Sequence, residues 1–203
     1  MNLDTAIVDY GTGNIRSVLK AIESLGYSAE VIDTPEKINS AKSLIIPGQG
    51  SSGYAMKKLR EKGLINPIID YIKAQRPYFG VCLGLQLLMQ TSEEDPEPCL
   101  GVIPGEVKKF QHELKIPHMG WNQVEFTNHN SVFSDIPDES FFYFVHSYYV
   151  DPLDKNIVIG KTEYGLNFCS AIAMDNVIAT QFHPEKSGEI GLSLYKNFLA
   201  NIK

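Results

Sequence analysis

Tyr78-Phe79-Gly80-Val81-Cys82-Leu83-Gly84, near the middle of the chain, reads as a short apolar strand that ends in the pattern G-x-C-x-G. A helical pattern of apolar residues follows at once, from Leu85 to Met89. A nucleophile on a sharp strand-to-helix turn needs small residues two positions before and after it, because larger side chains would clash there. The start of the helix would also favour the thiolate form of Cys82. The pattern predicts a catalytic cysteine in a parallel sheet, although a buried cysteine in a glycine-rich turn is the alternative.

A candidate base and its orienting group stand much later in the chain, at His183-Pro184-Glu185. An apolar strand over 177–182 would deliver His183 to its carboxyl end, and Pro184 would keep His183 extended. In an extended chain residues two apart face the same side, so Glu185 could hydrogen-bond the imidazole of His183. Cys82, His183 and Glu185 then form a nucleophile, a base and an orienting carboxylate.

A third element would complete the site where the buried-strand run Ser43-Leu44-Ile45-Ile46 breaks at Pro47-Gly48-Gln49-Gly50. Strands of an open parallel sheet end at the crevice where ligands bind. A glycine-rich strand end lets backbone N–H groups point at a developing oxyanion. We expect these donors in the peptide region of Gly48 and Gln49 and at the N–H of Leu83. An ordinary strand-to-helix turn at 47–50 is the alternative.

The order of strand and helix patterns predicts the fold class. Strands and helices alternate in the first half, where Asn14 is expected to cap a helix that begins at Ile15. From Val102 to Gln181 short strands dominate, and some of them must pair antiparallel. We therefore expect one α/β domain over residues 1–203. Its sheet would be open, mostly parallel and twisted, with helices on both faces and a β-rich antiparallel extension in the second half.

Composition limits the classes of partner and cofactor. The chain has 203 residues, and 24 acidic against 18 basic side chains give a net charge of −6. With no basic run, nucleic acids and anionic membranes are poor partners. No apolar stretch approaches the ~20 residues of a spanning helix, and no secretory signal is evident. Three cysteines without a C-x-x-C pair imply neither a disulfide framework nor a zinc site. A cytoplasmic enzyme without metal or cofactor is expected.

Taken together, these motifs resemble the triad (class I) glutamine amidotransferase family. The resemblance rests on Pro47-Gly48, on the run from Gly80 to Gln86 and on His183-Pro184-Glu185. Within that family the chain is similar to the glutaminase subunits of imidazole glycerol phosphate synthases, which act in histidine biosynthesis. That narrower likeness is carried by Asp9 to Asn14, by Pro117-His118-Met119-Gly120-Trp121-Asn122 and by Tyr143-Phe144-Val145-His146-Ser147-Tyr148. The resemblance extends from about residue 5 to residue 200.

The resemblance implies hydrolysis of L-glutamine through a thioester on Cys82, without a cofactor. It implies that Gly50, Gln86 and the backbone around Ser147 and Tyr148 bind the glutamine. It also implies a (β/α)₈-barrel cyclase subunit as the partner that receives the ammonia. The residues expected at that interface are Asn14, Trp121, Asn122 and Lys186. From the residues alone, Asn14 would be a helix cap, Trp121 a core residue and Lys186 a solvated lysine.

The chain departs from the family at Gln49, where members usually carry an aliphatic residue, and near Ser52, where they carry an aromatic one. We expect Gln49 to hold one orientation of the neighbouring peptide and so to shift the basal glutaminase rate. Three alternatives stay open: an amidotransferase subunit of another synthase, including a sugar-modifying paralogue; a thiol hydrolase or peptidase on a similar sheet; and a catalytically idle binding subunit.

Overall fold

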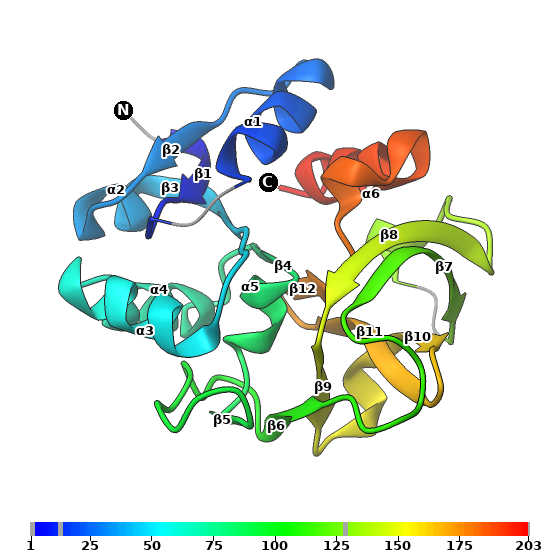
Figure 1. Cartoon of the computed structure of the whole chain (residues 1–203). Helices are drawn as coiled ribbons and strands as arrows, with labels where there is room; N and C mark the ends of the chain where they lie inside the picture. Colours follow the sequence, from blue (N-terminus) through cyan, green and yellow to red (C-terminus); the bar gives the residue numbers. More distant parts are fainter. Residues whose placement is uncertain (1–2, 12–13, 128–129, 203) are drawn as a thin grey trace.

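The computed structural model describes residues 3–11, 14–127 and 130–202 (Figure 1). The first half alternates strands with helices, and the second half is mainly strands, closed by one long helix. In chain order the elements are β1 (Leu3–Val8), α1 (Ile15–Ser24), β2 (Glu30–Ile32), α2 (Pro35–Ser40), β3 (Ala41–Ile46), α3 (Ser52–Glu61), α4 (Ile65–Lys73), β4 (Tyr78–Val81), α5 (Leu83–Gln86), β5 (Thr91–Ser92), β6 (Gly105–Lys109), β7 (His118–Phe126), η1 (Ser131–Phe133), β8 (Ser140–His146), β9 (Tyr148–Pro152), η2 (Lys155–Ile157), β10 (Val158–Glu163), β11 (Asn167–Met174), β12 (Val177–Thr180), η3 (Pro184–Lys186) and α6 (Gly188–Ala200).

Within the described residues, twelve strands form one mixed sheet with the main order β2-β1-β3-β4-β12-β11-β10-β7-β8. The pairs from β2 to β12 along this order are parallel. The pairs from β12 to β8 are antiparallel. Strands β9 and β6 extend the antiparallel part from β11. The expected α/β fold, with a parallel first half and an antiparallel extension, is confirmed.

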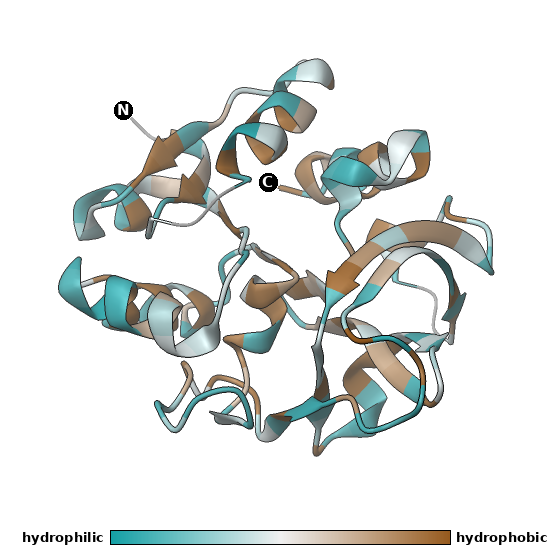
Figure 2. Ribbon diagram, in the orientation of Figure 1, coloured by the Kyte–Doolittle hydropathy of each residue, from teal (hydrophilic) through white to brown (hydrophobic). Residues whose placement is uncertain are grey.

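Alternating residues of the central strands bury opposite faces of the sheet. In β1, Ala6 and Val8 pack in the core under α2, α3, α4 and α5, whereas Ile7 packs in the core under α1 and α6. The same alternation separates Ile45 from its neighbours in β3, as the two-residue period of a strand requires. Figure 2 shows hydrophobic central strands and helices that turn hydrophilic sides outward. Helices therefore cover both faces of the parallel part, as expected.

Several boundaries differ from those expected from the sequence. Strand β7 begins at His118, so the run 118–122 that carries part of the resemblance lies in a strand. The expected strand over 177–182 ends at Thr180, and the helix expected from Leu85 to Met89 is the short α5. No helix of the described residues is long and apolar enough to cross a bilayer.

The fold brings three chain segments together at the carboxyl ends of neighbouring parallel strands. β3 ends at Ile46, β4 at Val81 and β12 at Thr180, and these strands are adjacent in the order β3-β4-β12. The segments that follow them carry all the residues expected for the triad and the oxyanion site. Carboxyl ends of parallel strands are where open α/β sheets bind ligands.

Candidate active site

Cys82 occupies a strained turn between β4 and α5. Its backbone angles are φ 53° and ψ −100°, a combination that costs a non-glycine residue about 1–3 kcal/mol. A Cβ atom on Gly80 would lie 2.7 Å from the carbonyl oxygen of Gly84, and one on Gly84 would lie 2.0 Å from that of Ile46. Both contacts are too short for any side chain. The need for small residues on either side of the nucleophile is thus a geometric fact of this turn.

His183 and Glu185 meet as expected, but through a different backbone. His183 Nδ1 lies 2.8 Å from Glu185 Oε1, and both side chains are buried. His183 itself is extended, as expected, with φ −102° and ψ 97°. Pro184, Glu185 and Lys186, however, form the 3₁₀ turn η3, so the strand alternation expected to carry on through Glu185 is wrong. The turn, rather than strand alternation, places the carboxylate beside the ring. The backbone N–H of His183 donates to the carbonyl of Tyr143 at 2.9 Å, which fastens this segment to β8.

Asn14 does not cap helix α1 with its side chain, which corrects the expectation from the sequence. Its backbone is left-handed, with φ 80°, and no cap hydrogen bond forms. Its side-chain Nδ2 donates instead to Glu185 Oε1. The hydroxyl of Tyr195 donates to the other carboxylate oxygen at 3.4 Å. Glu185 therefore accepts hydrogen bonds from three side chains, which fix its carboxylate behind His183.

The imidazole of His183 is electrostatically paired with the nucleophile. Burial alone would lower its pKa, but the nearby charge of Cys82 and the hydrogen-bonded Glu185 carboxylate raise the pKa to about 10. Nε2 of His183 is buried and has no hydrogen-bond partner among the described residues. At neutral pH His183 is thus an imidazolium beside the sulfur, and it holds a proton that it can pass to a leaving group.

Two backbone N–H groups are available near the sulfur for an oxyanion. Within the described part of the chain, the N–H groups of Gln49 and Leu83 have no acceptor. Gly48 packs so tightly that a Cβ there would lie 2.5 Å from both Leu83 Cβ and the hydroxyl of Tyr10. That hydroxyl donates to the carbonyl of Pro47 at 2.8 Å and fixes the preceding peptide. The strand end at 47–50 therefore lies against the nucleophile turn.

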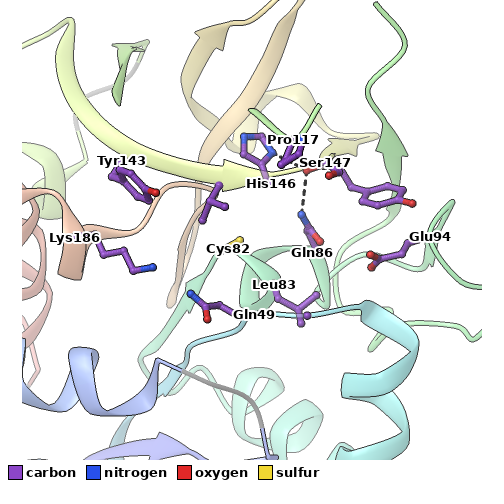
Figure 3. Close-up of a pocket in the computed structure, with 13 residues that line it drawn as sticks. Gln49, Cys82, Leu83, Gln86, Glu94, Pro117, Tyr143, His146, Ser147 and Lys186 are labelled. Atoms are coloured by element: carbon purple, nitrogen blue, oxygen red, sulfur yellow. Dashed lines mark hydrogen bonds between the residues drawn. The ribbon is translucent and has the colours of Figure 1, made fainter. Parts of the chain in front are cut away.

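A cavity of about 390 Å³ opens over the sulfur (Figure 3). The expected glutamine-binding residues Gly50, Gln86, Ser147 and Tyr148 line it together with Cys82, Gln49 and Leu83. Its remaining walls are Glu94, Pro117, Tyr143, Val145, His146 and Lys186. Figure 3 shows the carboxylate of Glu94 and the ammonium of Lys186 on opposite sides of the sulfur. A cavity with a carboxylate on one side and an ammonium on the other suits a small molecule that carries both a positive and a negative charge.

Gln86 projects into this cavity with a defined orientation. Its Nε2 donates to the carbonyl of Tyr148 and to Gln181 Oε1, both at 3.1 Å. Because the amide hydrogens are both used, its Oε1 is left as an acceptor. An amide oxygen in a cavity that also contains the Glu94 carboxylate suits an ammonium group.

Sequence reasoning missed Gln181, Glu94 and the histidines His118 and His146. Gln181 is fully buried, and its Nε2 lies 3.4 Å from Cys82 Sγ. The signal that could have found it is a long polar side chain directly before Phe182 and His183, at the end of a mostly apolar strand. His118 and His146 pair across β7 and β8 at 2.9 Å, a contact set by strand register and therefore not visible in the sequence.

The residues expected at a partner interface lie in different environments. Trp121 is 55% exposed on β7, so it is not a core residue. Asn122 donates to the backbone carbonyl of Glu163 at 2.9 Å, and Lys186 lies at the cavity with its ammonium over the ring of Tyr143. Asn14 is bound to Glu185, as described above. No cluster of three or more potential metal ligands occurs in residues 3–11, 14–127 and 130–202.

Solved structures with this fold include one described as a glutamine amidotransferase, with a TM-score of 0.76 and 23% identity, covering 96% of this chain and 97% of that one. The PurLQS structure from Thermotoga maritima gives a TM-score of 0.77 at 18% identity over both whole chains. At such identities the likeness shows the fold.

Other relatives are much more similar to this chain in sequence than these solved structures are. Imidazole glycerol phosphate synthase subunit HisH of Moorella thermoacetica is 48% identical over 95% of this chain and 92% of its own length. HisH of Dehalococcoides mccartyi is 46% identical over 95% of both chains, and HisH 1 of Methanococcus maripaludis is 47% identical over 96% and 98%. The family model for class-I glutamine amidotransferases matches residues 6–202. The chain therefore belongs to the class-I glutamine amidotransferases and, within them, to the HisH subunits of imidazole glycerol phosphate synthase.

Proposed function

We propose that Cys82, His183 and Glu185 hydrolyse L-glutamine and that the chain passes the ammonia to a cyclase subunit. Its family makes the chain the glutaminase subunit of an imidazole glycerol phosphate synthase, an enzyme of histidine biosynthesis. The single observation that carries the residue assignment is the cavity over Cys82, where two backbone N–H groups have no acceptor among the described residues and Glu185 holds the His183 ring in place.

In the first step, the Cys82 thiolate attacks the side-chain carboxamide carbon of glutamine. The N–H groups of Gln49 and Leu83 hold the negative oxygen of the tetrahedral intermediate. His183 then gives its proton to the leaving nitrogen, and ammonia departs as the thioester forms. Glu185 stabilises the imidazolium before the transfer and keeps the ring oriented throughout.

In the second step, a water molecule hydrolyses the thioester. His183, now neutral, removes a proton from that water, and the hydroxide adds to the thioester carbon. The C–S bond breaks, glutamate leaves, and the thiolate and imidazolium pair is restored. Forming the thioester removes the Cys82 charge that raises the pKa of His183, so the ring that donated a proton in the first step can accept one in the second.

The polarity of the cavity supports one orientation of the substrate. The α-ammonium group would lie against the free Oε1 of Gln86 on the side of Glu94. The backbone around Ser147 and Tyr148 would contact the α-carboxylate. The side-chain carboxamide would then extend toward the sulfur, between Gln49 and Leu83.

The partner, proposed as a (β/α)₈-barrel cyclase, is supported by an apolar face that leads to the cavity. Met119, Trp121 and Phe141 are 62%, 55% and 54% exposed. In the β7–β8 ladder, Met119 pairs with Val145 and Trp121 with Tyr143, and both of these partners line the cavity. A subunit docked on this face would cover the opening of the active-site cavity near Lys186. It would thereby keep ammonia from becoming ammonium in bulk water.

Two further expectations belong to this proposal: one amidotransferase domain over residues 1–203 and a cytoplasmic location. The first is supported by a sheet that runs through both halves of the chain. The second is supported by the free thiols of Cys82, Cys99 and Cys169, which suit a reducing compartment.

The test is glutamate release from L-glutamine by the purified chain alone, with a HisF-type cyclase, and with that cyclase carrying its nucleotide substrate. We expect strong stimulation by the loaded cyclase, complete loss in Cys82→Ala and little change in the matched variant Cys99→Ala. Formation of imidazole glycerol phosphate is followed in the same mixtures.

Other outcomes would overturn parts of the proposal. Stimulated glutamate release without the imidazole product would indicate another synthase or the sugar-modifying paralogue. Full activity without any partner would indicate an independent thiol hydrolase. A well-folded wild-type chain that is inactive in every mixture would indicate an idle binding subunit.

A further inference from the structure

Gln181 has a side chain that contacts the nucleophile but has no task in the triad mechanism. It is completely buried between β12 and His183. Its Nε2 donates to Cys82 Sγ at 3.4 Å, and its Oε1 accepts from Gln86 Nε2 at 3.1 Å. Burying an amide is costly unless both ends are hydrogen-bonded, and here one end contacts the reacting atom.

The orientation of the Gln181 amide follows from its neighbours. If it were reversed, its NH₂ group would face the NH₂ group of Gln86. Gln86 cannot turn to accommodate this, because its NH₂ also donates to the carbonyl of Tyr148. The N–H of Gln181 must therefore point at the sulfur.

The Tyr148 carbonyl is itself fixed by a pair of neutral histidines. His146 Nδ1 donates to it at 2.8 Å, so His146 Nε2 accepts from His118 Nδ1 at 2.9 Å. Burial lowers the pKa of His146 to about 3 and that of His118 to about 4, which keeps both rings neutral. His118 Nε2 in turn faces Asn122 Nδ2 at 3.3 Å. One consistent set of donors and acceptors thus runs from Asn122 to the sulfur.

We propose that Gln181 is a catalytic residue of the glutaminase reaction, whose amide N–H stabilises the Cys82 thiolate and whose amide oxygen ties that donor to the substrate-binding Gln86. A hydrogen bond to sulfur is stronger when the sulfur is charged, so it favours the thiolate over the thiol. The bond weakens when the thioester forms and returns when the thiolate is released. This role rests on the proposed function, but the state of the thiol can be measured without glutamine.

The test compares the wild-type chain with Gln181→Met and Gln181→Glu. Methionine fills a similar volume without an N–H donor, whereas glutamate keeps the shape and adds negative charge. Gln111→Met, at an exposed position outside the cavity, is the matched control. Thermal unfolding monitored by circular dichroism establishes that each variant is folded.

The readout is the rate of Cys82 alkylation by iodoacetamide as a function of pH, followed by mass spectrometry of the Cys82 peptide. Burial raises the pKa of Cys99 to about 11 and that of Cys169 to about 12, so these thiols react slowly. The charged or titratable groups around the sulfur are His183 with Glu185 behind it and, across the cavity, Glu94, Lys186, Tyr143, Tyr148 and the neutral His146. None of them is changed in these variants.

We expect Gln181→Met to raise the apparent pKa of the Cys82–His183 pair, read from the alkylation profile, by about one unit. At any pH below that apparent pKa, the alkylation rate should then be ~10-fold lower than in the wild type. Gln181→Glu should raise it at least as far. Both variants should also raise the KM for glutamine, because Gln86 loses or changes a partner. Gln111→Met should match the wild type.

An unchanged alkylation profile in folded Gln181→Met would overturn the proposal, and if that variant fails to fold, Gln181→Glu decides in the same way. A higher KM with an unchanged profile would reduce Gln181 to a residue that only positions Gln86. If the wild type releases no glutamate but the alkylation profiles still separate, the proposed function fails while the interaction with the thiolate stands.

Discussion

Replacing Gly84 by alanine adds one methyl group where the nucleophile turn meets strand β3. The new Cβ would lie 2.0 Å from the carbonyl oxygen of Ile46, whereas real contacts of this kind do not fall below 3.0 Å. The two backbones must therefore separate by about 1 Å (3.0 − 2.0). Overpacking of this size costs about 1–3 kcal/mol of stability.

The displacement would reach the oxyanion site, because Ile46 is followed by the segment 47–50. A misplacement of about 1 Å in a catalytic group lowers the rate about 10²-fold. We therefore expect the kcat for glutamate release in the complete synthase to fall about 100-fold, toward the range for loss of one oxyanion donor. The rate of Cys82 alkylation should change far less, since the sulfur keeps His183 beside it.

The control is Gly26→Ala at the end of α1. Gly26 has φ 81°, and a Cβ atom added there would have no neighbour within 4 Å. Alanine at this position therefore strains only the backbone, by about 1–2 kcal/mol. Both variants should lose stability in thermal unfolding, and only Gly84→Ala should lose kcat. If folded Gly84→Ala keeps kcat within about threefold of wild type, the link between the turn and the oxyanion strand is refuted.

Three further predictions concern single contacts. Asn14→Leu should lower kcat about tenfold even with saturating cyclase, because a hydrogen bond to a charged group contributes ~1.5–3 kcal/mol; if only affinity for the cyclase falls, Asn14 has a docking role alone. Tyr10→Phe should lower the free energy of unfolding by about 1–3 kcal/mol in urea titrations, since the Pro47 carbonyl loses a donor; an unchanged midpoint would contradict this. Since the pKa of His183 is raised to about 10, its stabilising contribution is complete below pH ~6.5 and lost as pH rises toward 10. His183→Gln should flatten the stability profile across that window, and parallel profiles would count against the ion pair.

The parts of the site that local sequence patterns control were predicted well. The turn at Cys82 was predicted because its geometry demands glycine at 80 and 84, whatever the rest of the chain does. The layered sheet was predicted because buried parallel strands and amphipathic helices carry distinct periodicities. The contact between His183 and Glu185 was also expected, although the structure reaches it through a 3₁₀ turn.

What the sequence did not reveal depends on contacts between distant segments. Asparagine is a preferred residue at helix N-caps, which is why the sequence suggested that role for Asn14. Its side-chain amide binds Glu185 instead, because the fold brings η3 close to the start of α1. The pairing of His118 with His146 requires one register between β7 and β8, since a shift of one residue would place them on opposite faces. Gln181 stands in a mostly apolar run, and its partners come from α5 and the nucleophile turn.

The backbone at Cys82 carries a cost that falls on the whole molecule. With φ 53° and ψ −100°, this residue contributes less to folding than a residue in a relaxed conformation would. Glycine tolerates positive φ without that penalty. Of two inactive variants that both lose the sulfur, Cys82→Gly should therefore unfold at a higher temperature than Cys82→Ala, because only alanine keeps the strained backbone. The melting temperature of the protein is thus set partly by the needs of catalysis and not only by packing. A substitution that relieves the strain at residue 82 would remove the nucleophile, so this gain in stability is not open to an active enzyme.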